Sequence, residues 1–137
     1  MTSRLNVLWT LVIAFVTATA VVYSETARTP QIPQVKLLRT PAGGIQPQTA
    51  LDSRGVLNMI YFTGDASEGN IEYVRRSPGA KAFSKPIRVN SQPGSALAVG
   101  TVRGPQMAVG RNGQVYVVWV GSSTAKPRGP DGSTPLL

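Results

Sequence analysis

The sequence of 137 residues contains neither cysteine nor histidine. Without cysteine, the chain has no disulfide framework, no thiol nucleophile and no cysteine-zinc site. Without histidine, it cannot by itself form a Ser-His-Asp or Cys-His triad or a histidine metal site. We therefore expect a chain that works without a metal or another cofactor.

Helical periodicity and acidic residues are also scarce. After residue 24, no stretch carries apolar residues at three- and four-residue spacing over three turns, which favours an all-β fold. The chain has 6 acidic residues against 14 lysines and arginines, and its formal charge is +8. No single element carries the stripe of basic and aromatic residues that would favour nucleic-acid binding. We interpret the excess charge as a solvated surface.

The first 24 residues differ from the rest of the chain. Arg4 is the only charged residue before Glu25, and positions 7–22 are almost continuously apolar. A basic start, an apolar core and small residues at its end are typical of a secretory signal peptide, so we expect a signal-peptide helix cleaved near residues 20–24. An uncleaved membrane anchor is the alternative, because the run approaches the ~18 residues of a membrane span.

This interpretation sets the expected location and domain plan. We predict a signal peptide over 1–24, export to the periplasm or the exterior, and no membrane attachment after cleavage. Residues 25–35 carry two prolines and little apolar content, which is typical of a linker. A short strand is expected at Val35–Leu38, ahead of the main domain.

One pattern occurs twice, 58 positions apart. Residues 47–61 align without a gap with residues 105–119, and Pro, Gln, Ala and Gly are identical at four positions. Each copy has a short apolar strand, a polar turn ending in Gly55 or Gly113, and a second strand of alternating polarity. Each copy therefore predicts a β-hairpin, and the repeat length is near that of propeller blades. Chance similarity of two common hairpins is the alternative.

Further strands extend the first copy into a four-stranded antiparallel meander over about 46–90. A second unit begins at about residue 105, and the chain stops where its third strand is expected. We therefore expect part of a longer protein, with a complete small β-sandwich as the alternative. The predicted strands are 47–52, 57–62, 71–76, 86–90, 106–110 and 114–120.

Several short motifs carry a resemblance to a known family. They are Gly43–Gln48, Ile60–Asp65, Tyr73–Arg75, Phe83–Asn90 and Gly110–Gly113. The chain over most of 36–137 resembles secreted bacterial proteins of the sialidase-like, BNR-repeat (Asp-box) superfamily. The resemblance implies about one and a half blades of a six-bladed β-propeller, with a glycan-binding or catalytic site at the axis. It also implies carbohydrate partners, including sialoglycans, and the remaining blades of the same propeller.

Two family motifs are altered in this sequence. When the Asp box is laid on residues 76–83, only Phe83 matches, a position whose ring is a structural plug between blades in the family. The family's substrate-binding arginine falls on Ile45, and an aliphatic side chain cannot form the bidentate pair with a carboxylate. Arg103 occupies the equivalent frame in the second copy, so it is a candidate substrate ligand. An ordinary exposed arginine is the alternative at that position.

One carboxylate matches the family better. Asp65 follows the second strand of the first unit, where the family places its acid/base aspartate, and Glu68 is the neighbouring candidate ligand. General acid catalysis needs a carboxyl with a raised pKa. The alternative for Asp65 is a turn residue that binds local amides. The tyrosines of the strands match no family nucleophile.

The expected function follows from these matches and departures. We predict a secreted, non-catalytic propeller segment that binds a glycan or a surface. The alternative is the N-terminal part of an exo-α-sialidase-type glycoside hydrolase.

Overall fold

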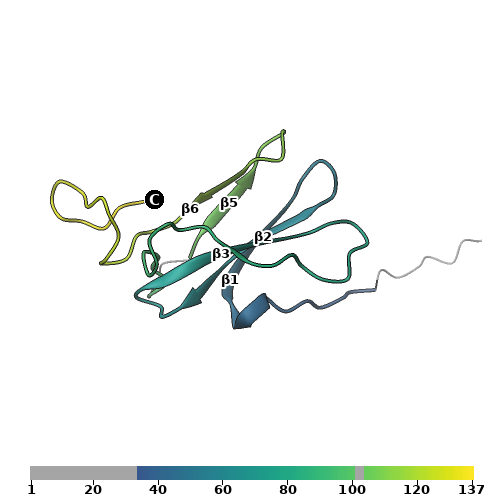
Figure 1. Ribbon diagram of the computed structural model, residues 1–137, viewed down its shortest axis with the longest axis horizontal. Helices are drawn as coiled ribbons and strands as arrows, with labels where there is room; N and C mark the ends of the chain where they lie inside the picture. The colour runs from purple at the N-terminus through teal and green to yellow at the C-terminus, as the bar shows by residue number, and fades with distance from the viewer. Residues whose placement is uncertain (1–33, 101–103) are drawn as a thin grey trace, which may run out of the picture. The chain divides into compact units, whose positions relative to one another are not determined.

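The computed structural model describes residues 34–100 and 104–137. The predicted signal peptide, most of the predicted linker and Arg103 therefore lie outside the described residues. Within the part that is described, no helix is long and apolar enough to cross a membrane. Residues Leu38–Leu137 form one compact unit, whose strands are drawn in Figure 1.

The predicted all-β class and the antiparallel meander are confirmed. Strands β1 to β4 form one sheet in the order β1-β2-β3-β4, and β5 and β6 form a second sheet. Each predicted strand boundary lies within two residues of the observed one. The elements are a 3-10 helix η1 (Pro41–Gly43), β1 (Ile45–Leu51), β2 (Leu57–Gly64), β3 (Gly69–Arg76), β4 (Ile87–Arg88), β5 (Gln106–Val109) and β6 (Val115–Val118).

The short strand expected at Val35–Leu38 does not form, and that prediction is wrong. Residues 34–40 have no regular structure, and Val35 and Leu37 are 88% and 90% exposed. A strand needs a neighbour whose backbone groups complete its hydrogen bonds. None of the described strands pairs with this stretch.

The two hairpins close with the same turn. In each, the first turn residue donates its amide to the carbonyl four positions later, and the glycine donates to the carbonyl of the first residue. The two glycines have φ of +74° and +79°, where a side chain would be strained. The turns are Asp52, Gly55 and Val56 in the first copy and Gly110, Gly113 and Gln114 in the second, with N–O distances from 2.8 to 3.0 Å. The sequence repeat is therefore also a structural repeat.

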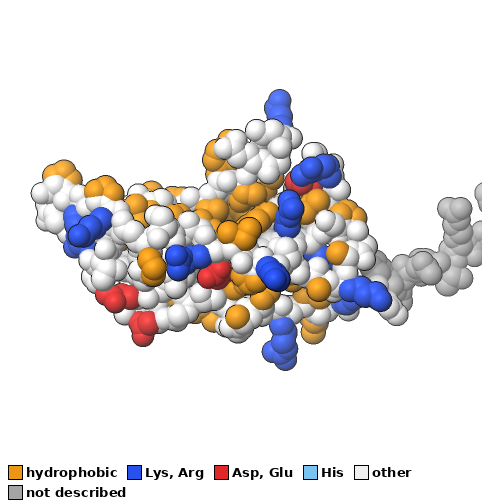
Figure 2. All heavy atoms as spheres, viewed as in Figure 1, with side chains coloured by type: hydrophobic (Ala, Val, Ile, Leu, Met, Phe, Trp, Pro, Cys, Tyr) orange, Lys and Arg blue, Asp and Glu red, His pale blue; other side chains and the backbone are white. Residues whose placement is uncertain are grey.

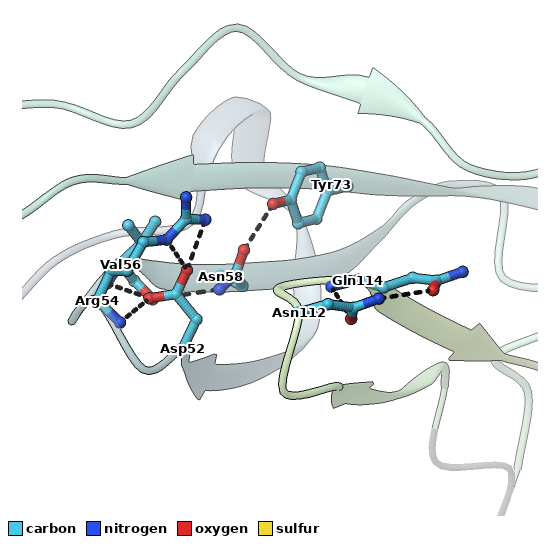
Figure 3. A network of polar contacts seen from close by, with 7 residues as sticks. All are labelled: Asp52, Arg54, Val56, Asn58, Tyr73, Asn112 and Gln114. Atoms are coloured by element: carbon cyan, nitrogen blue, oxygen red, sulfur yellow. Dashed lines mark hydrogen bonds and ion pairs between the residues drawn. The ribbon is translucent and has the colours of Figure 1, made fainter.

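The carboxylate of Asp52 adds hydrogen bonds to the first turn (Figure 3). Asp52 Oδ1 accepts the amides of Arg54 and Val56, both at 2.9 Å. The hydrogen bond from the Val56 amide is the largest cause of a lowered pKa at the Asp52 carboxyl. The hydrogen bonds and the charge of Arg54 lower this pKa further. In the second turn, Asn112 Oδ1 accepts the amide of Gln114 at 3.1 Å. An Asx side chain thus stabilises each turn.

The main core lies between the two repeats. Ile60 and Phe62 point from one face of β2, and the second repeat packs on them with apolar side chains from β5 and β6. Full burial of a side chain of this size contributes about 1.5–3 kcal/mol. The buried members are Ile60, Phe62, Ile71, Ala96 and Ala98, and the partly buried ones are Tyr73, Val89, Met107, Val117 and Trp119. An apolar interface therefore joins the two repeats.

The opposite face of β2 is buried as well. Met59 and Tyr61 point to this side and form a second cluster with Val74, against which Phe83 packs. The Tyr61 ring lies directly on Gly44, where a Cβ would overlap the ring. Burial on both faces explains why β2 is continuously apolar from Met59 to Phe62.

A buried asparagine follows the short strand β4. Asn90 is 1% exposed, and its Oδ1 accepts the amide of Ile71 at 2.9 Å. Its Nδ2 donates to Asn70 Oδ1, to the carbonyl of Gln92 and to Ser95 Oγ. The side chain thus completes the hydrogen bonding of β3 beyond β4 and fixes the start of the connection between the repeats.

Ala96 links the two sheets. It is fully buried, and its backbone exchanges two hydrogen bonds with Gly69 at the start of β3. On its other side it forms a bridge with Gly121, and the next amide, that of Leu97, donates to the carbonyl of Val120 at 3.1 Å. The backbone of the connection between β4 and β5 therefore pairs with both repeats.

The last described residues pair with the end of the second hairpin. Trp119 and Leu137 exchange two backbone hydrogen bonds of 2.9 Å each. In the first repeat the equivalent residue, Tyr61, pairs with Glu72 of β3. Leu137 thus lies where the third strand of the second unit was expected.

Candidate functional site

Three loops gather at the end of the sheets that carries the candidate carboxylates. They are residues 64–69 between β2 and β3, residues 91–98 between the repeats, and residues 121–134 after the second hairpin, and we call them the loop end. The amide of Ala98 donates to the carbonyl of Ala66 at 2.8 Å, which joins the first two loops.

Side chains join the second loop to the third. Gln92 Oε1 accepts the amide of Lys126 at 3.1 Å, and Gln92 Nε2 donates to the Lys126 carbonyl at 3.3 Å. The buried hydroxyl of Ser122 donates to the carbonyl of Gly94 at 2.6 Å. The Gln92 amide thus imitates a backbone pair across two loops that are far apart in the sequence.

Asp65 is an exposed turn residue within the loop end. Its Oδ1 accepts the amide of Ser67 at 2.8 Å and the Ser67 hydroxyl at 2.5 Å. The Ser67 hydroxyl above all, and then its amide, lower the pKa of the Asp65 carboxyl. This geometry matches the alternative interpretation, a turn aspartate that binds local amides.

Glu68 connects the first loop to the third. Its Oε1 accepts the hydroxyl of Ser123 at 2.9 Å, and both side chains are exposed. Two residues that are 55 positions apart in the sequence thus face the solvent together. No local pattern singled out Ser123, because its partner is known only once the two repeats are packed.

A third copy of the hairpin turn lies in the loop 121–134. Gly129 donates to the carbonyl of Ser133 at 3.0 Å, and Gly132 donates back to Gly129 at 2.9 Å, with φ of +79° at Gly132. Asp131 Oδ1 accepts the amide of Ser133 at 2.9 Å, and the Ser133 side chain is the main cause of the lowered pKa of Asp131. Arg128 Nη1 donates to the carbonyl of Ser123 at 2.8 Å and holds this turn against the rest of the loop.

The remaining sequence candidates do not join the loop end. Ile45 lies on β1 opposite Phe62 and is 49% exposed. Tyr61 is fully buried, and this burial, with the charge of Glu72, raises the pKa of its phenol. Tyr73 donates its hydroxyl to Asn58 Oδ1 at 2.6 Å (Figure 3). Both tyrosines are therefore explained by their part in the packing and hydrogen bonding of the fold.

The outer face of the β5–β6 hairpin is apolar. A shallow groove of about 240 Å³ runs over it, and Tyr116 and Val118 on this face are 55% and 38% exposed. The groove is lined by Gln106, Met107, Ala108, Tyr116, Val117 and Val118.

The acidic side chains of the described loop end do not form a cluster of metal ligands. Within residues 34–100 and 104–137, no three acidic side chains come together as metal ligands. Asp65, Glu68 and Asp131 each accept hydrogen bonds from serine side chains or amides instead.

The comparisons with known proteins give no family assignment. No protein-family model, no curated protein and no solved structure matches the chain significantly.

Proposed function

We propose that the chain is a secreted, non-catalytic part of a sialidase-like β-propeller and that its loop end binds a glycan. The observation that carries the proposal is the arrangement of three loops from two repeats, bonded to one another, with polar groups facing solvent. Loops held in this way present hydrogen-bonding groups to sugar hydroxyls. The exposed side chains are Ser67, Glu68, Gln92, Ser123, Lys126 and Arg128.

The surroundings of Asp65 favour binding over hydrolysis. A general acid has to keep its proton near neutral pH, which needs a raised pKa. Asp65 is exposed, and Ser67 lowers its pKa. The carboxylate is therefore suited to accepting hydrogen bonds, and we propose that the chain does not cleave a sialoside.

The packing of the repeats supports a propeller. Successive blades pack face to face, and their first strands lie next to each other around the axis. In this chain, β1 and β5 are the first strands of their repeats and lie in contact. The face of β2 that carries Ile60 packs against the face of β6 that carries Val117.

The same proposal accounts for the exposed face of the β5–β6 hairpin. Val118 is the repeat equivalent of Ile60, which the second repeat buries. Val118 and its neighbour Tyr116 are exposed on the equivalent face of the second repeat. We propose that a further sheet of the same kind covers this face, as the second repeat covers the first.

The proposal is tested by titrating the full chain with 3′-sialyllactose, lactose, maltotetraose and cellotetraose in a calorimeter. We expect saturable binding of at least one of them and no release of free sialic acid. Because Ser123 and Lys126 lie in the loop end, the pair Ser123→Ala and Lys126→Ala should weaken binding about tenfold, which is a loss of about 1.4 kcal/mol. Asn112→Ala, in the turn of the second hairpin, is the control and should bind like the parent.

Two results would overturn the proposal. One is the absence of binding to all four oligosaccharides. The other is sialic acid release that Asp65→Ala abolishes, which would favour the exo-α-sialidase alternative.

A further inference from the structure

The outer edge of the first sheet carries an excess of positive charge. Residues 75–88 contain five basic residues and no acidic one. Four of the five are exposed, and Arg76 is half-buried. The five are Arg75, Arg76, Lys81, Lys85 and Arg88. Figure 2 shows that basic side chains are spread over the viewed face, with acidic ones in fewer places.

These residues follow the free edge of the sheet. β4 is the last strand in the order β1-β2-β3-β4, and Ser84 extends its pairing by accepting and donating hydrogen bonds with the backbone of Arg75. The segment from Lys81 to Arg88 is therefore held against β3 rather than hanging free. We call residues 75–88 the basic edge.

The basic edge keeps an excess of positive charge within the fold, although Glu72 of β3 is the cross-strand partner of Arg88. Among the described residues, an ion pair forms elsewhere, between Arg54 and Asp52. Arg88 Nε donates to the carbonyl of Asn90 at 3.1 Å, and the Arg76 guanidinium lies 5.7 Å from the centroid of the Phe83 ring. Both contacts leave the positive charge in place.

We propose that the basic edge binds an acidic polysaccharide, that is, a polymer of sugars carrying carboxylate or sulfate groups. Its partner class rests on the proposed glycan function, but the basic edge shares no residue with the loop end. Like other polyanions, such a polymer releases counterions when arginines and lysines replace them, so affinity needs no deep pocket.

Other polyanionic partners fit this edge less well. A single-stranded nucleic acid would use exposed aromatic rings for base stacking, and the one aromatic residue here, Phe83, is half-buried under Arg76. A membrane would need several exposed aromatic or large apolar side chains to insert. The edge offers Ile87, which is 62% exposed.

Protection of the sheet edge is a competing explanation for the same residues. Lysine and proline on an edge strand prevent pairing with another chain, and this segment has Lys85 and Pro86. The two explanations differ in the sign of the charge that they require. Edge protection works with glutamate as well as with lysine, whereas binding to a polyanion needs positive charge.

Charge reversal therefore separates them. The full chain is titrated with heparin and with polygalacturonate, and with dextran as the neutral polymer, over a range of salt concentrations. We expect binding to both acidic polymers and none to dextran. The pair Lys81→Glu and Lys85→Glu should weaken binding at least about tenfold and reduce the salt slope by about one per lost contact. The variant should stay as soluble as the parent, since the edge remains charged.

The matched control is the pair Lys36→Glu and Arg111→Glu, two exposed basic residues outside the basic edge that give the same net charge. It should bind within about threefold of the parent, since it changes only the overall field. An equal loss in both pairs would overturn the proposal, as would tighter binding to single-stranded DNA or to anionic phospholipid vesicles. If the parent chain binds heparin but none of the four oligosaccharides, the loop-end proposal fails and the basic-edge proposal stands.

Discussion

The guanidinium of Arg54 lies against the backbone of Gly113, so that a Cβ on Gly113 would be 3.2 Å from Arg54 Nη2. The same guanidinium forms a 3.1 Å ion pair with Asp52, the carboxylate that stabilises the first hairpin turn (Figure 3). The turns of the two repeats therefore meet each other, far along the sheets from the loop end. This contact and the core between the repeats join the two hairpins.

Gly113→Ala should destabilise the chain by about 1–2 kcal/mol, because alanine is strained at its φ of +79°. Gly132 has the same φ with open space around it, so Gly132→Ala is the matched control for strain alone. We expect Gly113→Ala to cost about 0.5 kcal/mol more, the value of an exposed ion pair that Arg54 has to leave. Urea unfolding measures both. Adding Arg54→Ala should remove the difference, and equal costs in the two single variants would contradict the contact.

Gly44→Ala tests the close packing beneath Tyr61. Gly44 has negative φ, so alanine meets no backbone strain there, but its Cβ would overlap the Tyr61 ring. We expect a loss of about 3 kcal/mol in the free energy of unfolding, as for overpacking of a core. Gly43→Ala, with φ of +68° and nothing within 4 Å, should lose only about 1 kcal/mol. A smaller loss for Gly44→Ala than for Gly43→Ala would show that the Tyr61 ring does not lie there.

Asn90→Ala tests the buried polar group at the start of the connection. The change removes the acceptor of the Ile71 amide and leaves that amide buried without a partner. We expect a loss of about 3 kcal/mol in urea unfolding. The exposed Asn112→Ala should cost less than about 1 kcal/mol. Similar costs for the two variants would contradict the role of Asn90.

The folded state should lose stability in acid. The pKa values of Asp52, Asp65 and Asp131 are all lowered from the ordinary 3.8 by hydrogen bonds in their turns. A lowered pKa contributes stability that is present above about pH 4 and lost as the pH falls through the folded-state pKa. Urea midpoints at pH 7, 4 and 3 should therefore fall most at the last step. Asp52→Asn keeps the turn acceptor without the charge and should flatten this dependence; an unchanged dependence would contradict it.

Local patterns were enough to predict the strands. The turn glycines and the alternation of residues 114–119 act within a few positions, and the repeat supplied the same pattern twice. The strand expected at Val35–Leu38 failed because a strand also needs a partner, which no local pattern guarantees. The roles of Asn90 and Ala96 were missed for the same reason, since their partners lie on β3 and beyond β6.

The candidate site was predictable only in part. The loop that carries Asp65 and Glu68 was located from its position after a strand. Its contact with Ser123, and the pairing of Gln92 with Lys126, depend on how the repeats pack. The basic edge was interpreted as solvated surface because its residues are separated in the sequence. Pairing of Ser84 with Arg75 brings that segment to one edge of the sheet.

The site of glycan binding can be located directly on the chain. Amide resonances of the ¹⁵N-labelled full chain can be followed while each of the four oligosaccharides is added. If the loop end binds the glycan, the amides of residues 64–69, 91–98 and 121–134 should shift together, with one dissociation constant, while those of the two hairpin turns stay unchanged. Shifts centred on the turns at Asp52 and Gly110, or no shifts with any of the four sugars, would contradict loop-end binding.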